Sequence, residues 1–129
     1  MLLADISIKN HPMDYIAVMN ITIVELPEFI RKSEKLMNSE EHDSLLSFLS
    51  TNPTAGILIQ GTGGVRKLRW ATGNKGKSGS TRMIYFYHNP DMPLFLLTAF
   101  SKSEQGNLTK SERNELAGLT KILVQNYTR

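Results

Sequence analysis

The chain contains no cysteine, and this absence removes two ways of stabilising a small protein. Neither disulfides nor thiolate metal sites can form, so packing and hydrogen bonds have to hold the fold. A chain without cysteine suits a reducing cytoplasm. Its 129 residues are enough for one hydrophobic core and too few for two. We therefore expect one cytoplasmic domain.

Long apolar runs are also missing. A run such as Leu94–Leu97 is far shorter than the ~20 residues that a membrane-spanning helix needs. Near the start, Asp5, Lys9 and Asp14 interrupt any apolar segment of the kind found in signal peptides. We therefore expect neither membrane insertion nor secretion.

Acidic residues are absent between Asp43 and Asp91. Residues 1–43 hold four basic and eight acidic residues, a net charge of −4, whereas residues 44–102 hold seven basic residues and one acidic residue, a net charge of +6. Cations without acidic neighbours attract polyanions such as RNA. The alternative, which this asymmetry leaves open, is a solvated face paired with the acidic N-terminal part.

The first half of the chain predicts a strand followed by two helices. A β-branched run, Ile21–Val24, precedes Pro27, which suits the first turn of a helix. A second helix is expected to have Ser39 as its N-cap, with acidic residues in its first turn. Asn52 and Pro53 would end it.

From Gly56 onward, short extended segments alternate with turns. The predicted strands are Ile57–Gln60, Val65–Trp70, Arg82–Tyr87 and Leu94–Phe100. The last two flank residues 88–93, whose two prolines favour an antiparallel hairpin, and a final helix is predicted to start at the capping box Thr109–Glu112. This order favours an α+β fold with a small antiparallel sheet, two N-terminal helices and a C-terminal helix.

The strand Val65–Trp70 carries the clearest candidate site. Alternation places Lys67 and Arg69 on one face, about 7 Å apart, and turns Leu68 and Trp70 towards the core. Two like charges this close repel each other unless an anion lies between them. The pattern therefore favours a phosphate site over an ordinary solvent-facing strand, which remains the alternative.

Residues 71–78 nearly reproduce the phosphate-binding loop of nucleotide hydrolases, with Ala71 in place of the first glycine. That motif requires a helix after Lys77 and Ser78, but a strand sequence follows here. Nucleotide hydrolysis is therefore not expected. A flexible loop that clamps a polyanion, or a mobile hairpin, fits these residues better.

No metal site is predicted, because His11, His42 and His88 lie in different segments and no acidic pair occurs in the basic region. No cofactor is expected either. RNA can be cleaved without metal when its own 2′-hydroxyl attacks the neighbouring phosphate and cations stabilise the charge that develops. Lysine and arginine can supply those cations.

Three blocks of sequence, Gly61–Arg69, Gly79–Phe86 and Leu96–Glu104, resemble RelE/HigB toxins of bacterial toxin-antitoxin systems, most closely the HigB branch. The resemblance covers about Ile21 to Tyr127. It implies a compact RelE-like fold and a ribosome-dependent endoribonuclease that cuts mRNA. It also implies a cognate helix-turn-helix antitoxin, through which alone the chain would meet DNA.

Position by position, the family's catalytic residues fall on Lys67, Arg69, Arg82 and Lys102. The chain has Ser103 where the RelE type can show a second basic residue. Residues that we expect to hold RNA are Arg66, Lys75 and Lys77. Lysine suits proton transfer better than arginine, which keeps its charge near neutral pH.

The resemblance also suggests where the domain begins. Met19 could serve as an initiator, so we expect residues 1–18 to be an N-terminal extension and residues 19–129 to be the toxin domain. Tyr85 and Tyr87 are expected to be core or cross-strand aromatics rather than base-stacking residues.

Two other functions remain open at this point. The chain could be a non-catalytic module that binds messenger or ribosomal RNA through the same basic surface. Alternatively, that surface could serve only an acidic protein partner.

Overall fold

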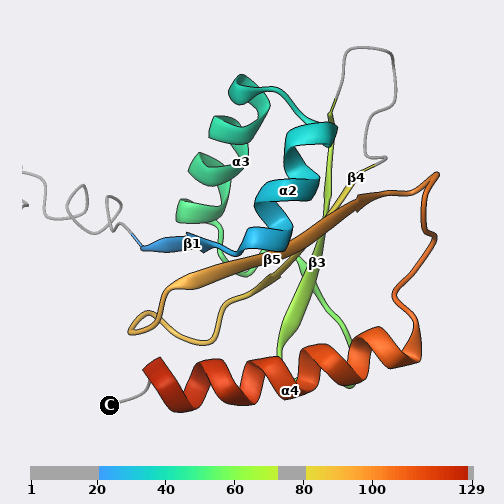
Figure 1. Ribbon diagram of the computed structural model, residues 1–129. Helices are drawn as coiled ribbons and strands as arrows, with labels where there is room; N and C mark the ends of the chain where they lie inside the picture. The colour runs from blue at the N-terminus through green and yellow to red at the C-terminus, as the bar shows by residue number, and fades with distance from the viewer. Residues whose placement is uncertain (1–20, 73–80, 128–129) are drawn as a thin grey trace, which may run out of the picture.

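The computed structural model describes residues 21–72 and 81–127 and has the α+β architecture that the sequence predicts (Figure 1). The elements are β1 Ile23–Glu25, α2 Pro27–Leu36, α3 Ser39–Thr51, β2 Ile57–Leu58, β3 Val65–Trp70, β4 Thr81–Phe86, β5 Leu94–Ser101 and α4 Lys110–Tyr127. The strand β3 has its predicted bounds, and the other strands differ from prediction by one or two residues at their ends. The expected extension, residues 1–18, lies outside the described residues.

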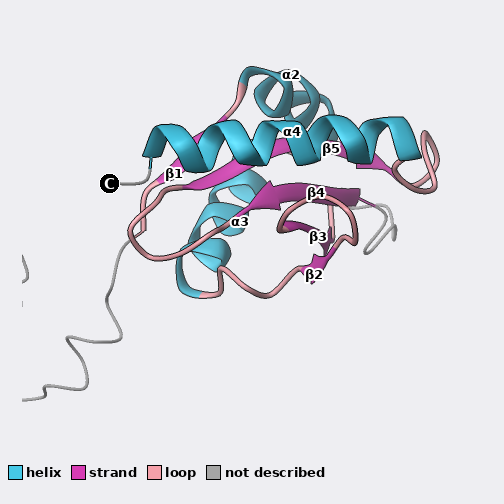
Figure 2. Ribbon diagram, turned by 90° about the horizontal axis from the view of Figure 1, so that it is seen from below, coloured by secondary structure: helices cyan, strands magenta, loops and turns pink. Residues whose placement is uncertain are grey.

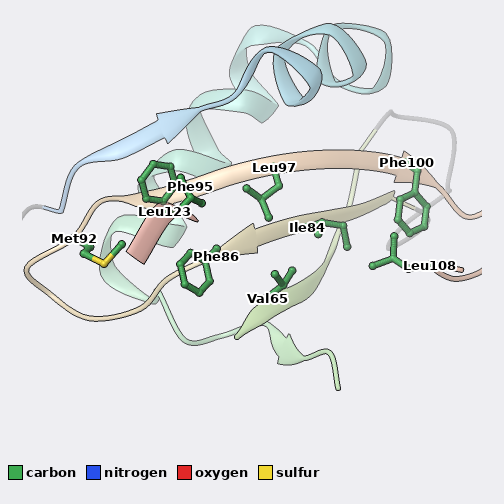
Figure 3. Close-up of a cluster of buried hydrophobic side chains, with 9 residues drawn as sticks. All are labelled: Val65, Ile84, Phe86, Met92, Phe95, Leu97, Phe100, Leu108 and Leu123. Carbon is green, nitrogen blue, oxygen red and sulfur yellow. The ribbon is translucent and has the colours of Figure 1, made fainter. Parts of the chain in front are cut away.

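The sheet separates two hydrophobic clusters. On one side, α4 covers a cluster that Figure 3 shows gathered on β3, β4 and β5, including Ile84, Phe86 and Phe100. On the other side, α2 and α3 cover a second cluster that includes Met83 and Tyr85. The helix α4 passes in front of β5 when the molecule is viewed from below (Figure 2). Because both faces are covered, the central strand β4 is buried at every residue.

The sheet is mixed, which corrects the expected small antiparallel sheet. Strand order is β1-β5-β4-β3-β2, and β1 runs parallel to β5, with Ile23 opposite Leu94. The other neighbours are antiparallel, including the predicted hairpin of β4 and β5. A parallel pair needs a long crossover connection, here α2, α3 and three strands. Local sequence patterns carry no signal for a pairing across such a distance.

Side chains cap two helices. The N-cap of α3 is Asn38 and not Ser39, as the sequence suggested, because the Asn38 side chain accepts from the backbone N–H of Glu41 at 2.8 Å. The Glu41 carboxylate accepts from the backbone N–H of Asn38 at 2.9 Å, which completes a capping box. At α4 the predicted box is confirmed, with Thr109 N–H donating to Glu112 at 2.8 Å and Glu112 N–H donating to the Thr109 hydroxyl at 3.1 Å.

The turn before β3 is joined to α4. Gly61, Gly63 and Gly64 all have positive φ. The hydroxyl of Thr120 on α4 lies 3.0 Å from the carbonyl oxygen of Thr62. The hydroxyl of Thr62 donates to the carbonyl oxygen of Ile59 and accepts from the backbone N–H of Val65, the first residue of β3. These buried bonds fix α4 against the turn that starts β3.

Gly63 and Gly61 allow a matched test of this junction. An alanine at either position would be strained by about 1–2 kcal/mol, because L residues disfavour positive φ. At Gly63 a Cβ would also lie 2.5 Å from the Thr120 hydroxyl oxygen, whereas at Gly61 it would meet nothing within 4 Å. We expect Gly63→Ala to lower the free energy of unfolding in urea clearly more than Gly61→Ala. Equal losses would contradict this close packing.

Tyr85 is structural, as its position in the strand predicted. Its buried hydroxyl accepts from the N–H of Gly56 and donates to the carbonyl oxygen of Pro53, both at 2.8 Å. Burial raises the pKa of Tyr85, so this hydroxyl stays protonated and keeps its donor. Tyr87, half-buried, packs against the cluster under α2 and α3. Tyr85 thus fastens the segment before β2 to the centre of the sheet.

Candidate functional site

Three of the predicted cations come together on the α4 side of the sheet. In the register of β3 and β4, Lys67 lies opposite Ile84, whose side chain belongs to the cluster under α4, and Arg69 lies opposite Arg82. Leu68 packs in the other cluster, which confirms the predicted alternation. Lys67, Arg69 and Arg82 therefore share one face of two adjacent strands.

Arg82 is the most buried of these cations. Only 8% of its surface is exposed, and it lies opposite Phe100 in the pairing of β4 with β5. Its Nη1 atom lies 3.4 Å from the carbonyl oxygen of Thr81. A guanidinium held by its surroundings loses little side-chain entropy when it binds a phosphate, and it can donate two parallel hydrogen bonds.

Lys67 is held by a residue that the sequence reasoning missed. Its ammonium group donates to the side-chain oxygen of Asn107 at 3.1 Å. Asn107 belongs to the connection between β5 and α4, which turns at the end of the sheet (Figure 1). The two residues are 40 positions apart, so no local motif could have linked them.

The connection between β3 and β4 starts and ends beside these cations. The hydroxyls of Thr72 and Thr81, both buried, lie 2.6 Å apart and join its two ends. The expected RNA-binding residues Lys75 and Lys77 belong to this connection and lie outside the described residues. The next described element is the strand β4, which begins at Thr81.

Arg66 lies apart from the three cations, and Lys102 follows the end of β5. Lys102 is exposed and comes directly after β5, whose last residue, Ser101, pairs with Thr81. Arg66 belongs to the opposite face of β3, where its Nη1 atom donates to the carbonyl oxygens of Thr54 at 3.1 Å and Gly56 at 2.8 Å. The site is thus centred on β3 and β4, with Lys102 at its margin.

Charges of opposite sign line two separate cavities. One of about 500 Å³ lies beside Trp70 and Ala71, and the start of α3 lines it with the carboxylates of Glu40, Glu41 and Asp43. The other, of about 200 Å³, lies between α2 and the end of β5 and is lined by Arg31, Lys32 and Lys35 together with Glu104 and Gln105. The acidic start of α3 therefore lies beside the end of β3 on the α3 side of the sheet, away from Lys67 and Arg69.

No three His, Asp or Glu side chains within residues 21–72 and 81–127 are grouped so that they could hold a metal ion. No helix there is both long and apolar enough to cross a membrane.

The fold and site define a small α+β protein that presents clustered cations suited to phosphate on one face of its sheet. A family model described as the RelE toxin of the RelE / RelB toxin-antitoxin system matches residues 53–128, more than half of the chain. The chain therefore belongs to the RelE toxin family. Toxins of this family partner with an antitoxin and are generally endoribonucleases. The matched range includes β2 to α4 and thus every candidate cation on β3 and β4.

The Glu112 carboxylate joins the connection that carries Asn107 to the start of α4. The backbone N–H of Thr109, above all, lowers the pKa of Glu112 below its ordinary value, and Gln105 also donates to this carboxylate. Because the folded-state pKa is lowered, the stabilisation is complete above the unfolded-state pKa and is lost as the pH falls through the folded-state pKa.

We therefore expect Glu112→Gln to lower stability at neutral pH by up to about 1 kcal/mol, since the carboxylate is half-buried and solvent still screens its charge. The gap in melting temperature between wild type and variant should close in acid, as thermal unfolding from pH 7 to pH 3 would reveal. Glu115→Gln, on an exposed residue of the same helix, is the control. A gap that stays constant with pH would argue against this role of the carboxylate.

Proposed function

We propose that this chain is the toxin of a toxin-antitoxin pair, of the HigB branch, and that it cleaves mRNA on the ribosome without a metal ion. The observation that carries the proposal is the convergence of Lys67, Arg69 and Arg82 on one face of β3 and β4. Cleavage by the 2′-hydroxyl of the RNA itself requires positive charge where the phosphate becomes pentacovalent, and these residues provide it.

The residues divide the chemistry according to their side chains. The 2′-hydroxyl gives up its proton to solvent water, and its oxygen bonds to phosphorus as the bond to the 5′-oxygen breaks. The products are a cyclic phosphate and, once the leaving oxygen is protonated, a 5′-hydroxyl. Arg69 and Arg82 stabilise the negative charge on the non-bridging oxygens, because a guanidinium keeps its charge and can donate twice. Lys67 supplies the proton that the leaving 5′-oxygen takes up.

The remaining predicted residues would extend the site along the RNA. Lys102 lies just beyond β5 and would contact the scissile region from its margin. Lys75, Lys77 and Arg66 would hold the strand through its phosphates. In the cytoplasm the cognate helix-turn-helix antitoxin would neutralise the toxin, and the chain would reach DNA only through that partner.

Arg82→Ala is the main test of catalysis. Loss of one preorganised donor costs ~10²- to 10³-fold in rate, about 3–4 kcal/mol. In a translating extract, wild type should cut mRNA only when ribosomes are present, and Arg82→Ala should bind ribosomes but cut that much more slowly. Lys121→Ala removes the same charge from an exposed position of α4 and should cut normally. A wild type that binds ribosomes without cutting mRNA would establish the non-catalytic binding module instead.

Removal of Lys75 and Lys77 tests how the RNA is held. If both contact phosphates, the double alanine variant should flatten the dependence of log affinity on log salt concentration by about two units. The measurement is ribosome binding from low to moderate salt. Lys110→Ala with Lys121→Ala changes the net charge equally at exposed positions of α4. An unchanged slope in the loop variant would mean that these lysines do not contact phosphate.

A further inference from the structure

We infer that Asn107 is a positioning residue, which aims the ammonium group of Lys67 at the scissile phosphate and leaves its charge intact. The inference rests on the proposed catalytic role of Lys67. Its basis is the 3.1 Å hydrogen bond from the Lys67 ammonium to the Asn107 side-chain oxygen. A lysine side chain has many rotamers, and a fixed acceptor selects the few that place the ammonium in one direction.

Asn107 can act as such an acceptor because its backbone is fixed on both sides. Before it, the Gln105 side chain donates to the carbonyl oxygen of Asn107 at 2.9 Å. After it, Leu108 is buried in the cluster under α4, and Arg113 donates to the Leu108 carbonyl oxygen at 2.9 Å. The exposed amide of Asn107 therefore projects from an anchored connection.

A second set of bonds ties this connection to the start of α4. The Gln105 amide nitrogen that reaches Asn107 also donates to the Glu112 carboxylate at 2.9 Å, and Glu112 in turn caps α4 through Thr109. The position of Lys67 is thus coupled to the N-terminus of α4 through Gln105 and Asn107. These bonds hold the backbone at Asn107 in place, as a positioning role for its side chain requires.

The chemistry of the amide explains why an asparagine suits this position. An ammonium group has three N–H donors, so one bond to Asn107 leaves two for phosphate oxygens. A carboxylate would hold Lys67 more strongly, but its negative charge would oppose the phosphate and offset the positive charge that the site needs. A neutral acceptor orients Lys67 without that penalty.

A double-mutant cycle on the full chain tests the inference. We expect Asn107→Ala to slow single-turnover cleavage of ribosome-bound mRNA by about 10-fold, because Lys67 is no longer oriented. Ribosome affinity and melting temperature should stay near wild type. In a Lys67→Ala background the same change should have almost no further effect, since a residue that acts through Lys67 cannot act without it. Asn114→Ala, an exposed asparagine of α4, is the matched control.

Asn107→Asp keeps the acceptor and adds a charge. Asn107→Asp should weaken RNA binding as well as cleavage, whereas Asn107→Ala should slow cleavage alone. Comparison of the two variants therefore separates the effect of charge from the effect of orientation. Independently of cleavage, mass spectrometry after brief acylation should find Lys67 more reactive in Asn107→Ala than in wild type, because its ammonium group is no longer held.

Three results would overturn the inference. Equal rate losses from Asn107→Ala with and without Lys67 would mean that Asn107 acts by itself. Unchanged acylation of Lys67 would mean that the hydrogen bond does not form in solution. If Lys67→Ala cuts as fast as wild type, the assignment of Lys67 in the proposed function fails, and the positioning role fails with it. Acylation of Lys67 reports the hydrogen bond whether or not Lys67 is catalytic. A fast Lys67→Ala variant together with changed acylation would therefore refute the catalytic role of Lys67 and leave the hydrogen bond in place.

Discussion

The register between β3 and β4 is the constraint on which both the core and the site depend. Since side chains alternate along a strand, the pairing that puts Arg69 opposite Arg82 also puts Leu68 opposite Met83, on the other face. A slip of one residue would carry Lys67 and Arg69 to the face covered by α2 and α3. The free-energy cost of burying two cations on that face would be far larger than the cost of changing the hydrogen bonds between the two strands. The hydrophobic clusters therefore specify where the cations lie.

The α4 side of the sheet has an apolar end and a cationic end. Towards one end of β4, Phe86 packs against Phe95, which the ring of Tyr127 also contacts at a centroid distance of 5.1 Å. Towards the other end, Arg82 lies beside Phe100. The apolar end fastens α4, and the cationic end is left next to the start of that helix. Tyr127 belongs to the apolar end, because it contacts Phe95, the partner of Phe86. Phe86 lies four residues, or ~13 Å, along β4 from Arg82.

Sequence reasoning succeeded where the determining contacts are local. The bounds of β3 and the capping box of α4 follow from alternation and from side-chain spacing within a few residues. The parallel pairing of β1 with β5 and the bond from Lys67 to Asn107 join distant segments, so only the folded chain brings them together. The cap of α3 was misplaced by one residue because Asn38 and Ser39 are both good N-caps, and the spacing to Glu41 decides between them.

Arg66 shows what a charge count alone cannot supply. It belongs to the same basic stretch as Lys67, but alternation turns it to the other face, where backbone carbonyl oxygens of Thr54 and Gly56 hold its guanidinium. Under the proposed function, only the remaining N–H donors of Arg66 could bind RNA. The contribution of Arg66 to RNA binding would then depend on how the RNA passes the edge of β3. Net charge favours a polyanion as the partner, and the register determines which cations share one face of the sheet.

Neutral oxygens hold two of the cations on β3. Lys67 and Arg66 are fixed by an amide oxygen and by carbonyl oxygens, which orient a cation without neutralising it. A carboxylate in those places would have fixed them more strongly and cancelled the field that attracts a phosphate. At Lys67 a neutral acceptor orders the cation and leaves its charge in place, and the proposed stabilisation of a pentacovalent phosphate requires both.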